Sequence, residues 1–177
     1  TGGLRIGVSD GILKESFTKL GKRNKFEIDE YWHGFSFPFQ NFFYWLNGEA
    51  LPPNVNTKEL FHSFMLANSF EDKLIKEVES KKFFSEFKWD GIRAQIIFSN
   101  SGKIYSRSGD DITESFPELD IKEKELSVID GELVVKKNNK ILSFNDLQKR
   151  IGRKEVNFKI IESYPIHFIA YDILFMN

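Results

Sequence analysis

The spacing of apolar residues divides the chain into a helical first third and a strand-rich remainder. In the first third, apolar residues recur every three or four positions, as they do on the buried face of an amphipathic helix. This spacing predicts helices over residues 11–20, 27–33 and 37–46. Short polar turns separate them, so we expect a small helical unit at this end of the chain.

A turn-rich connector follows the predicted helices. Residues 51–56 include two adjacent prolines and are expected to be extended. Thr57 is the predicted N-cap of a short helix that runs through Phe61. We expect a domain boundary after this helix, and one more amphipathic helix over residues 71–80. The sequence therefore predicts that helices lead into the strand-rich part.

The first predicted strand, over residues 83–90, has a polar face and an aromatic face, and the aromatic face is expected to turn toward a core. The polar face holds Glu86, Lys88 and Asp90, and the aromatic face holds Phe83, Phe87 and Trp89. The pair Asp90-Gly91 is a strong turn signal. Lys88 is therefore expected where a strand gives way to a turn, a place that suits ligand contact.

Two hairpins and a final strand are predicted beyond this point. Residues 94–99 and 103–107 flank a turn at 100–102, and residues 128–136 and 140–144 flank a turn at Asn138-Asn139. Asn145 is the predicted cap of a short helix over 146–151 that Gly152 ends, and the last strand spans 166–175. These elements predict an α+β fold, in which a helical N-terminal segment precedes a largely antiparallel sheet.

Composition narrows the possible functions only slightly. The chain has 177 residues, 41% of them hydrophobic, and a net charge of −1, so any nucleic-acid surface must be local. It has no cysteine, which excludes disulfides and thiolate metal sites and suits a cytoplasmic protein. No apolar run reaches the length of about 20 residues that spans a membrane, so we expect no membrane partner. The three histidines share no metal-ligand spacing and are expected to be structural.

The string Lys88-x-Asp90-Gly91-x-Arg93 is the strongest chemical signal, although alone it also fits an amphipathic strand with a solvated edge. Three further strings follow it in order: Tyr105-Ser106-Arg107-Ser108, Asp130-Gly131-Glu132-Leu133-Val134 and Ala170-Tyr171-Asp172-Ile173-Leu174. Together the four strings resemble motifs I, Ia, III and IIIa of the ATP-dependent DNA ligases, and residues 1–8, 64–67 and 144–150 also resemble segments of that family, the last in its bacterial form. The resemblance covers nearly the whole chain.

The resemblance implies a catalytic nucleophile at Lys88, whose amine would attack the α-phosphate of ATP and carry AMP. An ordinary lysine has a pKa of about 10.4, so such a site must favour the neutral amine. Glu132 would be a ligand of the ribose or of Mg²⁺ or Mn²⁺, for which hard oxygen donors are suited. A surface lysine and a solvated strand glutamate are the plain alternatives.

The other nucleotide-binding residues are also implied by the family. Arg93 and Arg107 would contact phosphate and ribose, because the guanidinium group matches paired oxygens, although exposed strand arginines are the simpler interpretation. The backbone at Glu86 would recognise adenine, and the Tyr171 ring would stack on it unless that tyrosine is merely buried. Asp90 is expected to fix the turn or to orient polar neighbours.

A DNA contact is implied at the start of the chain, where Gly2, Gly3 and Arg5 would clamp the phosphate backbone of nicked duplex DNA. The resemblance assigns residues 1–62 to the end of a helical DNA-binding domain and 63–177 to the first part of an adenylation, or nucleotidyltransferase, domain. We expect a monomer and a fragment that stops before the second half of that domain and before an OB-fold domain. The implied activity is sealing of nicks through a lysine–AMP intermediate.

Two alternatives remain open at this point. The chain could belong to an RNA ligase or an mRNA-capping enzyme, which use the same lysine chemistry, although the segment that begins at Thr1 argues against both. It could also be a truncated, non-catalytic DNA-binding module that keeps the motifs as scaffold. GTP labelling would favour a capping enzyme, and DNA binding without any lysine adduct would favour the module.

Overall fold

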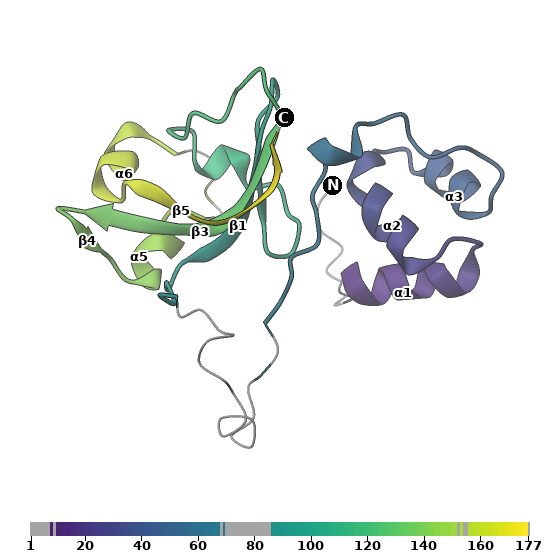
Figure 1. The fold of residues 1–177 in the computed structure, drawn as a ribbon, viewed down its shortest axis with the longest axis horizontal. Helices are drawn as coiled ribbons and strands as arrows, with labels where there is room; N and C mark the ends of the chain where they lie inside the picture. Colours follow the sequence, from purple (N-terminus) through teal and green to yellow (C-terminus); the bar gives the residue numbers. More distant parts are fainter. Residues whose placement is uncertain are drawn as a thin grey trace.

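The computed structural model of the protein describes residues 8, 10–67, 69, 86–151, 153 and 156–176. A group of helices formed by the first part of the chain lies beside a sheet formed by the later part (Figure 1). The expected order of a helical segment followed by an antiparallel sheet is therefore confirmed. The helix predicted over residues 71–80 lies outside the described residues.

The helical unit contains α1 (Asp10–Leu20), α2 (Lys25–Tyr31) and α3 (Gln40–Leu46), and a 3₁₀ turn (Trp32–Gly34) continues α2. Its core consists of Ile28, Phe42, Trp45 and Leu46, all nearly inaccessible to solvent, and most of the partly buried side chains packed against it are aromatic. A capping box stabilises the start of α2, because Asn24 and Glu27 each accept from the other's backbone N–H. The apolar spacing therefore predicted these three helices correctly.

Two helix starts differ from prediction. The third helix begins at Gln40 rather than at residue 37, because Pro38 disfavours the helical conformation at Phe37. The helix predicted from Thr57 is only a 3₁₀ turn (Thr57–Glu59), and its N-cap is Asn56, whose side chain accepts from Lys58 N–H. It ends at once because Leu60 is extended, with φ −98° and ψ 166°.

The sheet pairs its described strands antiparallel to one another. It contains β1 (Ile92–Phe98), β2 (Lys103–Ser106), β3 (Ser127–Lys137), β4 (Lys140–Ile141) and β5 (Ile166–Met176). β1 lies between β2 and β3, and β3 also pairs with β4 and β5. Both predicted hairpins and the final strand are confirmed, but the strand predicted over 140–144 is only Lys140–Ile141, because Phe144 already begins a helix. β3 is the strand with the most partners, since it pairs with β1, β4 and β5.

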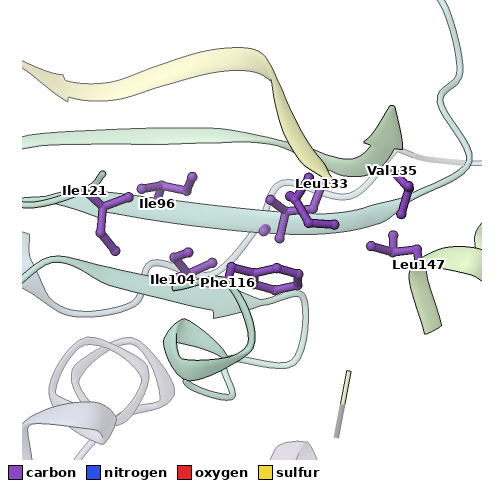
Figure 2. Close-up of a cluster of buried hydrophobic side chains, with 9 residues drawn as sticks. Ile96, Ile104, Phe116, Ile121, Leu133, Val135 and Leu147 are labelled. Carbon is purple, nitrogen blue, oxygen red and sulfur yellow. The ribbon is translucent and has the colours of Figure 1, made fainter. Parts of the chain in front are cut away.

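A hydrophobic core covers one face of this sheet (Figure 2). Side chains from β1, β2 and β3 pack there against the loop after β2 and against α5 (Phe144–Gln148); Figure 2 labels Ile96, Ile104, Phe116, Ile121, Leu133, Val135 and Leu147. The predicted cap Asn145 was wrong, because it lies inside α5 and Ser143 holds the N-cap position. The structure adds α6 (Phe158–Ser163), which the sequence did not predict. The opposite face carries a smaller buried cluster, which includes Phe61, Ile97 and Val128, and beside it the candidate site.

Candidate functional site

The described part of the segment that carries Lys88 is not a strand, so the prediction was wrong there, whereas Phe83 lies outside the described residues. Residues 86–90 are irregular and β1 begins only at Ile92. The N–H of Gly91 donates to Glu132 Oε1 at 3.2 Å, so its acceptor is a side-chain carboxylate and not a backbone carbonyl of the neighbouring strand. Phe87, expected in the core, is 81% exposed, and its ring lies 5.4 Å from that of Trp89. The chain thus leaves the sheet just before β1 and places Lys88 in the open.

Gly91 is required here for close approach rather than for a turn. A Cβ atom at this position would lie 2.2 Å from the carbonyl oxygen of Leu133 and 2.7 Å from Cγ of Glu132. No side chain fits in that space. The absence of a side chain therefore lets the Lys88 segment lie directly against β3.

A cavity of about 580 Å³ opens on the sheet face opposite the core, and Lys88 is at its wall. Three parts of the chain form the wall: residues 63–67, residues 86–88, and the facing side chains of β1, β3 and β5. The sequence-predicted residues at the wall are Glu86, Lys88, Arg93 and Tyr171. The cavity thus combines an amine, a guanidinium group and an aromatic ring, which are the groups that bind phosphates and a base.

Arg93 is fixed by a paired contact with Asp130, a residue of β3 that lies diagonally across from it, because the direct partner of Asp130 on β1 is Gln95. Its Nε and Nη2 atoms donate to the two carboxylate oxygens of Asp130, at 3.2 and 2.7 Å. Its guanidinium carbon also lies 4.9 Å from the centre of the Phe64 ring. The hydrogen bonds to Asp130 raise the pKa of Arg93 above its ordinary value, so the group stays charged. In the described part of the chain Nη1 has no hydrogen-bond partner, which leaves its N–H groups for an anionic ligand.

Glu132 joins the Lys88 segment to β5. One of its oxygens accepts from Gly91 N–H, and the other accepts from the Tyr171 hydroxyl at 2.9 Å. Burial, together with this bond to the Glu132 carboxylate, raises the pKa of the Tyr171 phenol well above its ordinary value. The phenol therefore remains a donor at neutral pH, and the ring is held in one orientation at the cavity wall.

Two irregularities in the pairing of β3 with β5 aim side chains at the cavity. Asp130 pairs with Asp172 but its neighbour Gly131 pairs with Ala170, so Tyr171 is the extra residue. Leu174 is the extra residue at the second shift, between Val128 and Ile129 on β3. Both extra residues line the cavity. A regular ladder would have alternated the side chains of β5 between the two faces.

The remaining predicted residues lie elsewhere or are not described. Arg107 is exposed directly after β2 and is not among the residues that line this cavity. Gly2, Gly3 and Arg5 lie outside the described residues. Both Arg107 and the DNA clamp therefore stay predictions from the resemblance.

The described residues contain no group of three or more His, Cys, Asp or Glu side chains arranged to hold a metal ion. Mg²⁺ is commonly bound through one or two carboxylates together with substrate phosphates, and Glu132 could supply one such carboxylate. Two of the three histidines pack on aromatic rings: His33 lies 5.3 Å from Phe61, and His62 lies 5.0 Å from Phe175, whereas His167 is exposed. Burial lowers the pKa of His62.

Phe64, Gln95 and Asp130 are among the residues at the site that were not named as candidates from the sequence. Phe64 and Asp130 belong to strings that were noted for their resemblance, but nothing local indicated their contacts with Arg93. Gln95 carried only one signal, which is that it lies two residues after Arg93 and so shares its face of β1.

Comparisons with known proteins identify the family of this chain. Residues 64–177 match the family described as the ATP dependent DNA ligase domain, and the chain belongs to that family. It is 33% identical to a probable DNA ligase of Koribacter versatilis, over 99% of this chain and 31% of that protein. It is 28% identical to a DNA ligase of Methanosphaera stadtmanae, over 97% of this chain and 32% of that protein. The chain thus spans about a third of the length of these relatives.

Two further likenesses cover less of the chain. DNA ligase 1 of Saccharomyces cerevisiae is 35% identical over 60% of this chain and 15% of its own length. Among solved structures, the ligase domain from M. tuberculosis LigD matches with a TM-score of 0.39 and 31% identity, over 51% of this chain and 29% of that one. Separately, no helix among the described residues is long and apolar enough to cross a membrane.

Proposed function

We propose that this chain is the part of an ATP-dependent DNA ligase that forms the lysine–AMP intermediate, and that Lys88 is the nucleophile. The observation that carries the proposal is the position of Lys88 at the wall of the cavity that also holds Arg93 and Tyr171, in a chain of the ligase family. The neutral amine of Lys88 attacks the α-phosphorus of ATP. A P–N bond forms, the bond from the α-phosphorus to the bridging oxygen breaks, pyrophosphate leaves, and the amine loses a proton.

The surrounding residues have distinct roles in this proposal. Arg93, held by Asp130, offers its remaining N–H groups to ribose or phosphate oxygens. Tyr171 stacks on adenine while Glu132 holds its hydroxyl, and the backbone at Glu86 contacts the base. Glu132 also supplies a carboxylate to Mg²⁺ or Mn²⁺, which would neutralise phosphate charge. Arg107 would contact a phosphate after a rearrangement or through another part of the ligand.

The later steps belong to the whole protein. AMP passes from Lys88 to the 5′-phosphate of a nick, and the adjoining 3′-hydroxyl then attacks that phosphate and releases AMP. We propose nicked duplex DNA as the partner, with Gly2, Gly3 and Arg5 on its backbone, residues 1–62 as part of a DNA-binding domain, and residues 63–177 as part of the adenylation domain. A monomer in the cytoplasm is the accompanying expectation.

The proposal is tested by the intact mass of the protein before and after incubation with ATP and Mg²⁺. We expect a gain of one AMP that is absent in Lys88→Ala and in Lys88→Arg, because the guanidinium group does not act as a nucleophile at neutral pH. Lys124→Ala, which changes an exposed lysine, is the matched control and is expected to label normally.

The experiment is done on this chain and on a longer ligase that contains it, and GTP replaces ATP in a parallel reaction. Labelling by GTP instead of ATP would indicate a capping enzyme. A longer protein that binds ATP but never gains AMP would refute the lysine mechanism.

A further inference from the structure

Gln95 is a fully buried polar residue in the middle of β1, with 0% of its surface exposed. Its side-chain oxygen accepts from the backbone N–H of His62 at 2.8 Å, and its side-chain N–H donates to the carbonyl of the same residue at 3.1 Å. The amide of one side chain thus pairs with a backbone in the way that a neighbouring strand would. The pairing joins positions 33 residues apart in the sequence.

Ile97, Gln95 and Arg93 share one face of β1, and each of them contacts a residue of the segment 61–67. Ile97 and Phe61 belong to one buried hydrophobic cluster. Gln95 pairs with His62, and Arg93 lies over the ring of Phe64. The segment therefore runs antiparallel to β1 with a fixed register, although it is not a strand of the sheet.

This register decides one wall of the cavity. Ser63, Phe64, Met65 and Ala67 all line it, and they directly follow the residue that Gln95 holds. A hydrogen-bonded pair of buried partners resists sliding, because a shift of one residue would leave both the amide and the backbone groups of His62 unpaired. An apolar contact such as the one between Ile97 and Phe61 would tolerate such a shift more easily, since it has no direction.

We propose that Gln95 is a positioning residue for the lysine-adenylation reaction: it fixes the register of residues 61–67 along β1 and thereby places Phe64 against Arg93 at the nucleotide cavity. Gln95 acts on the ligand through these two residues. The kinetic part of this inference rests on the proposed function, whereas the structural part does not.

The structural part is tested by amide hydrogen exchange, measured by NMR, in wild type and Gln95→Met. Methionine has a similar length and no group that pairs with His62. We expect exchange of the His62 amide to become at least about tenfold faster, while amides paired between β1 and β3 exchange as in wild type. Unchanged exchange at His62, or equal acceleration throughout β1 and β3, would overturn the proposal.

The kinetic part uses the rate of AMP attachment as a function of ATP concentration. We expect Gln95→Met to raise the KM for ATP by about tenfold and to change the rate at saturating ATP by less than about twofold, because the nucleophile itself is untouched. Phe64→Leu is expected to raise KM similarly without altering His62 exchange. The double variant should be no worse than the worse single variant, since both changes act on one contact; fully additive effects would contradict this.

Thr113→Val is the matched control, because it also removes a side-chain hydrogen bond to a strand backbone, the one accepted from Ile104 N–H at 2.9 Å. It should lower stability and leave both His62 exchange and KM unchanged. If Gln95→Met does not fold, Gln95→Asn keeps a neutral amide on a side chain one methylene shorter, which cannot reach both the N–H and the carbonyl of His62. For this variant we expect a His62 amide exchange rate and a KM for ATP between the wild-type values and those expected when the pairing with His62 is lost completely. Wild-type values of both would overturn the proposal. A wild type that never attaches AMP refutes the proposed function, and the exchange result still decides the register.

Discussion

The carboxylate of Glu132 accepts two hydrogen bonds, from Gly91 N–H at 3.2 Å and from the hydroxyl of the cavity residue Tyr171 at 2.9 Å. An ionised carboxylate has about four lone-pair sites, so these two bonds leave acceptor capacity for a ribose hydroxyl or a cation. Glu132 is itself only 9% exposed. Its structural role and its proposed ligand role therefore go together: the group that would meet the nucleotide also orients the residues on either side of it.

The ring and the hydroxyl of Tyr171 can be separated by substitution. Tyr171→Ala removes the proposed stacking surface and should slow AMP attachment at limiting ATP by at least about tenfold, since stacking of a base on an aromatic ring contributes about 1–3 kcal/mol. Tyr171→Phe keeps the ring and loses only the bond to Glu132, so a loss of about two- to fivefold is expected. Single-turnover labelling measures both. Equal losses in the two variants would show that the hydroxyl, and not the ring, matters.

Among the elements, β5 and the hairpin of β3 and β4 each depart from regular strand geometry, β5 in its register and the hairpin in its backbone angles. β5 is irregular where it meets the cavity, and its two extra residues, Tyr171 and Leu174, turn toward the ligand side. The hairpin needs a tight reversal, and Asn138 and Asn139 both adopt positive φ angles, 49° and 60°. Two consecutive positive φ angles match the twist of the paired strands, and asparagine accepts them more readily than most residues.

The hairpin makes a prediction about stability. Asn139→Gly should raise the free energy of unfolding slightly, because glycine has no Cβ to strain at φ 60°. Asn139→Val should lower it by about 1–2 kcal/mol, since a β-branched side chain fits this backbone region poorly. Urea denaturation measures both. Lys140→Val, which lies at the first position of β4 and is exposed, tests whether valine is harmful for another reason; a loss as large as that of Asn139→Val would refute the argument.

On the scale of the molecule, Arg150 ties together the parts that cover the core face of the sheet. Its side chain is fully buried and donates to the carbonyls of Ser115 and Tyr164, at 3.0 and 2.8 Å, and to Glu118 at 2.7 Å. Its guanidinium carbon also lies 5.7 Å from the centre of the Phe116 ring. One residue thus links the loop after β2, 35 residues away from it in the sequence, to the end of α6, 14 residues away.

Removal of this group should be costly. Arg150→Met leaves two carbonyls and the Glu118 carboxylate without their donor and is expected to lower the free energy of unfolding by about 3–5 kcal/mol. Arg150→Lys keeps the charge but reaches fewer partners, so the loss should be smaller. The double variant Arg150→Met with Glu118→Leu should recover part of the loss, because the unpaired charge is gone. Urea denaturation is the measurement, and a double variant less stable than Arg150→Met would contradict the role of the ion pair.

The sequence by itself determined the elements whose reasons are local. The apolar stripes of α1, α2 and α3 and the turns at 100–102 and at Asn138-Asn139 depend on residues a few positions apart, so they were predictable from pattern and turn chemistry. The motif order also identified the ligase family, which the match over residues 64–177 confirms. The sequence therefore indicated which residues, such as Lys88 and Tyr171, belong to the motifs, but not which residues they contact.

Only the tertiary structure decided how those residues are aimed. The sequence around Lys88 predicted a strand. In the structure, Gly91 N–H bonds to the side chain of Glu132, 41 residues away, and the strand pairing begins only after Gly91. Tyr171 faces the cavity because of a register shift against β3, and Gln95 is significant because His62 lies beside it. Each of these contacts joins residues that are distant in the sequence. The energies that decide them depend on burial and on the exact partner available, which no local pattern contains.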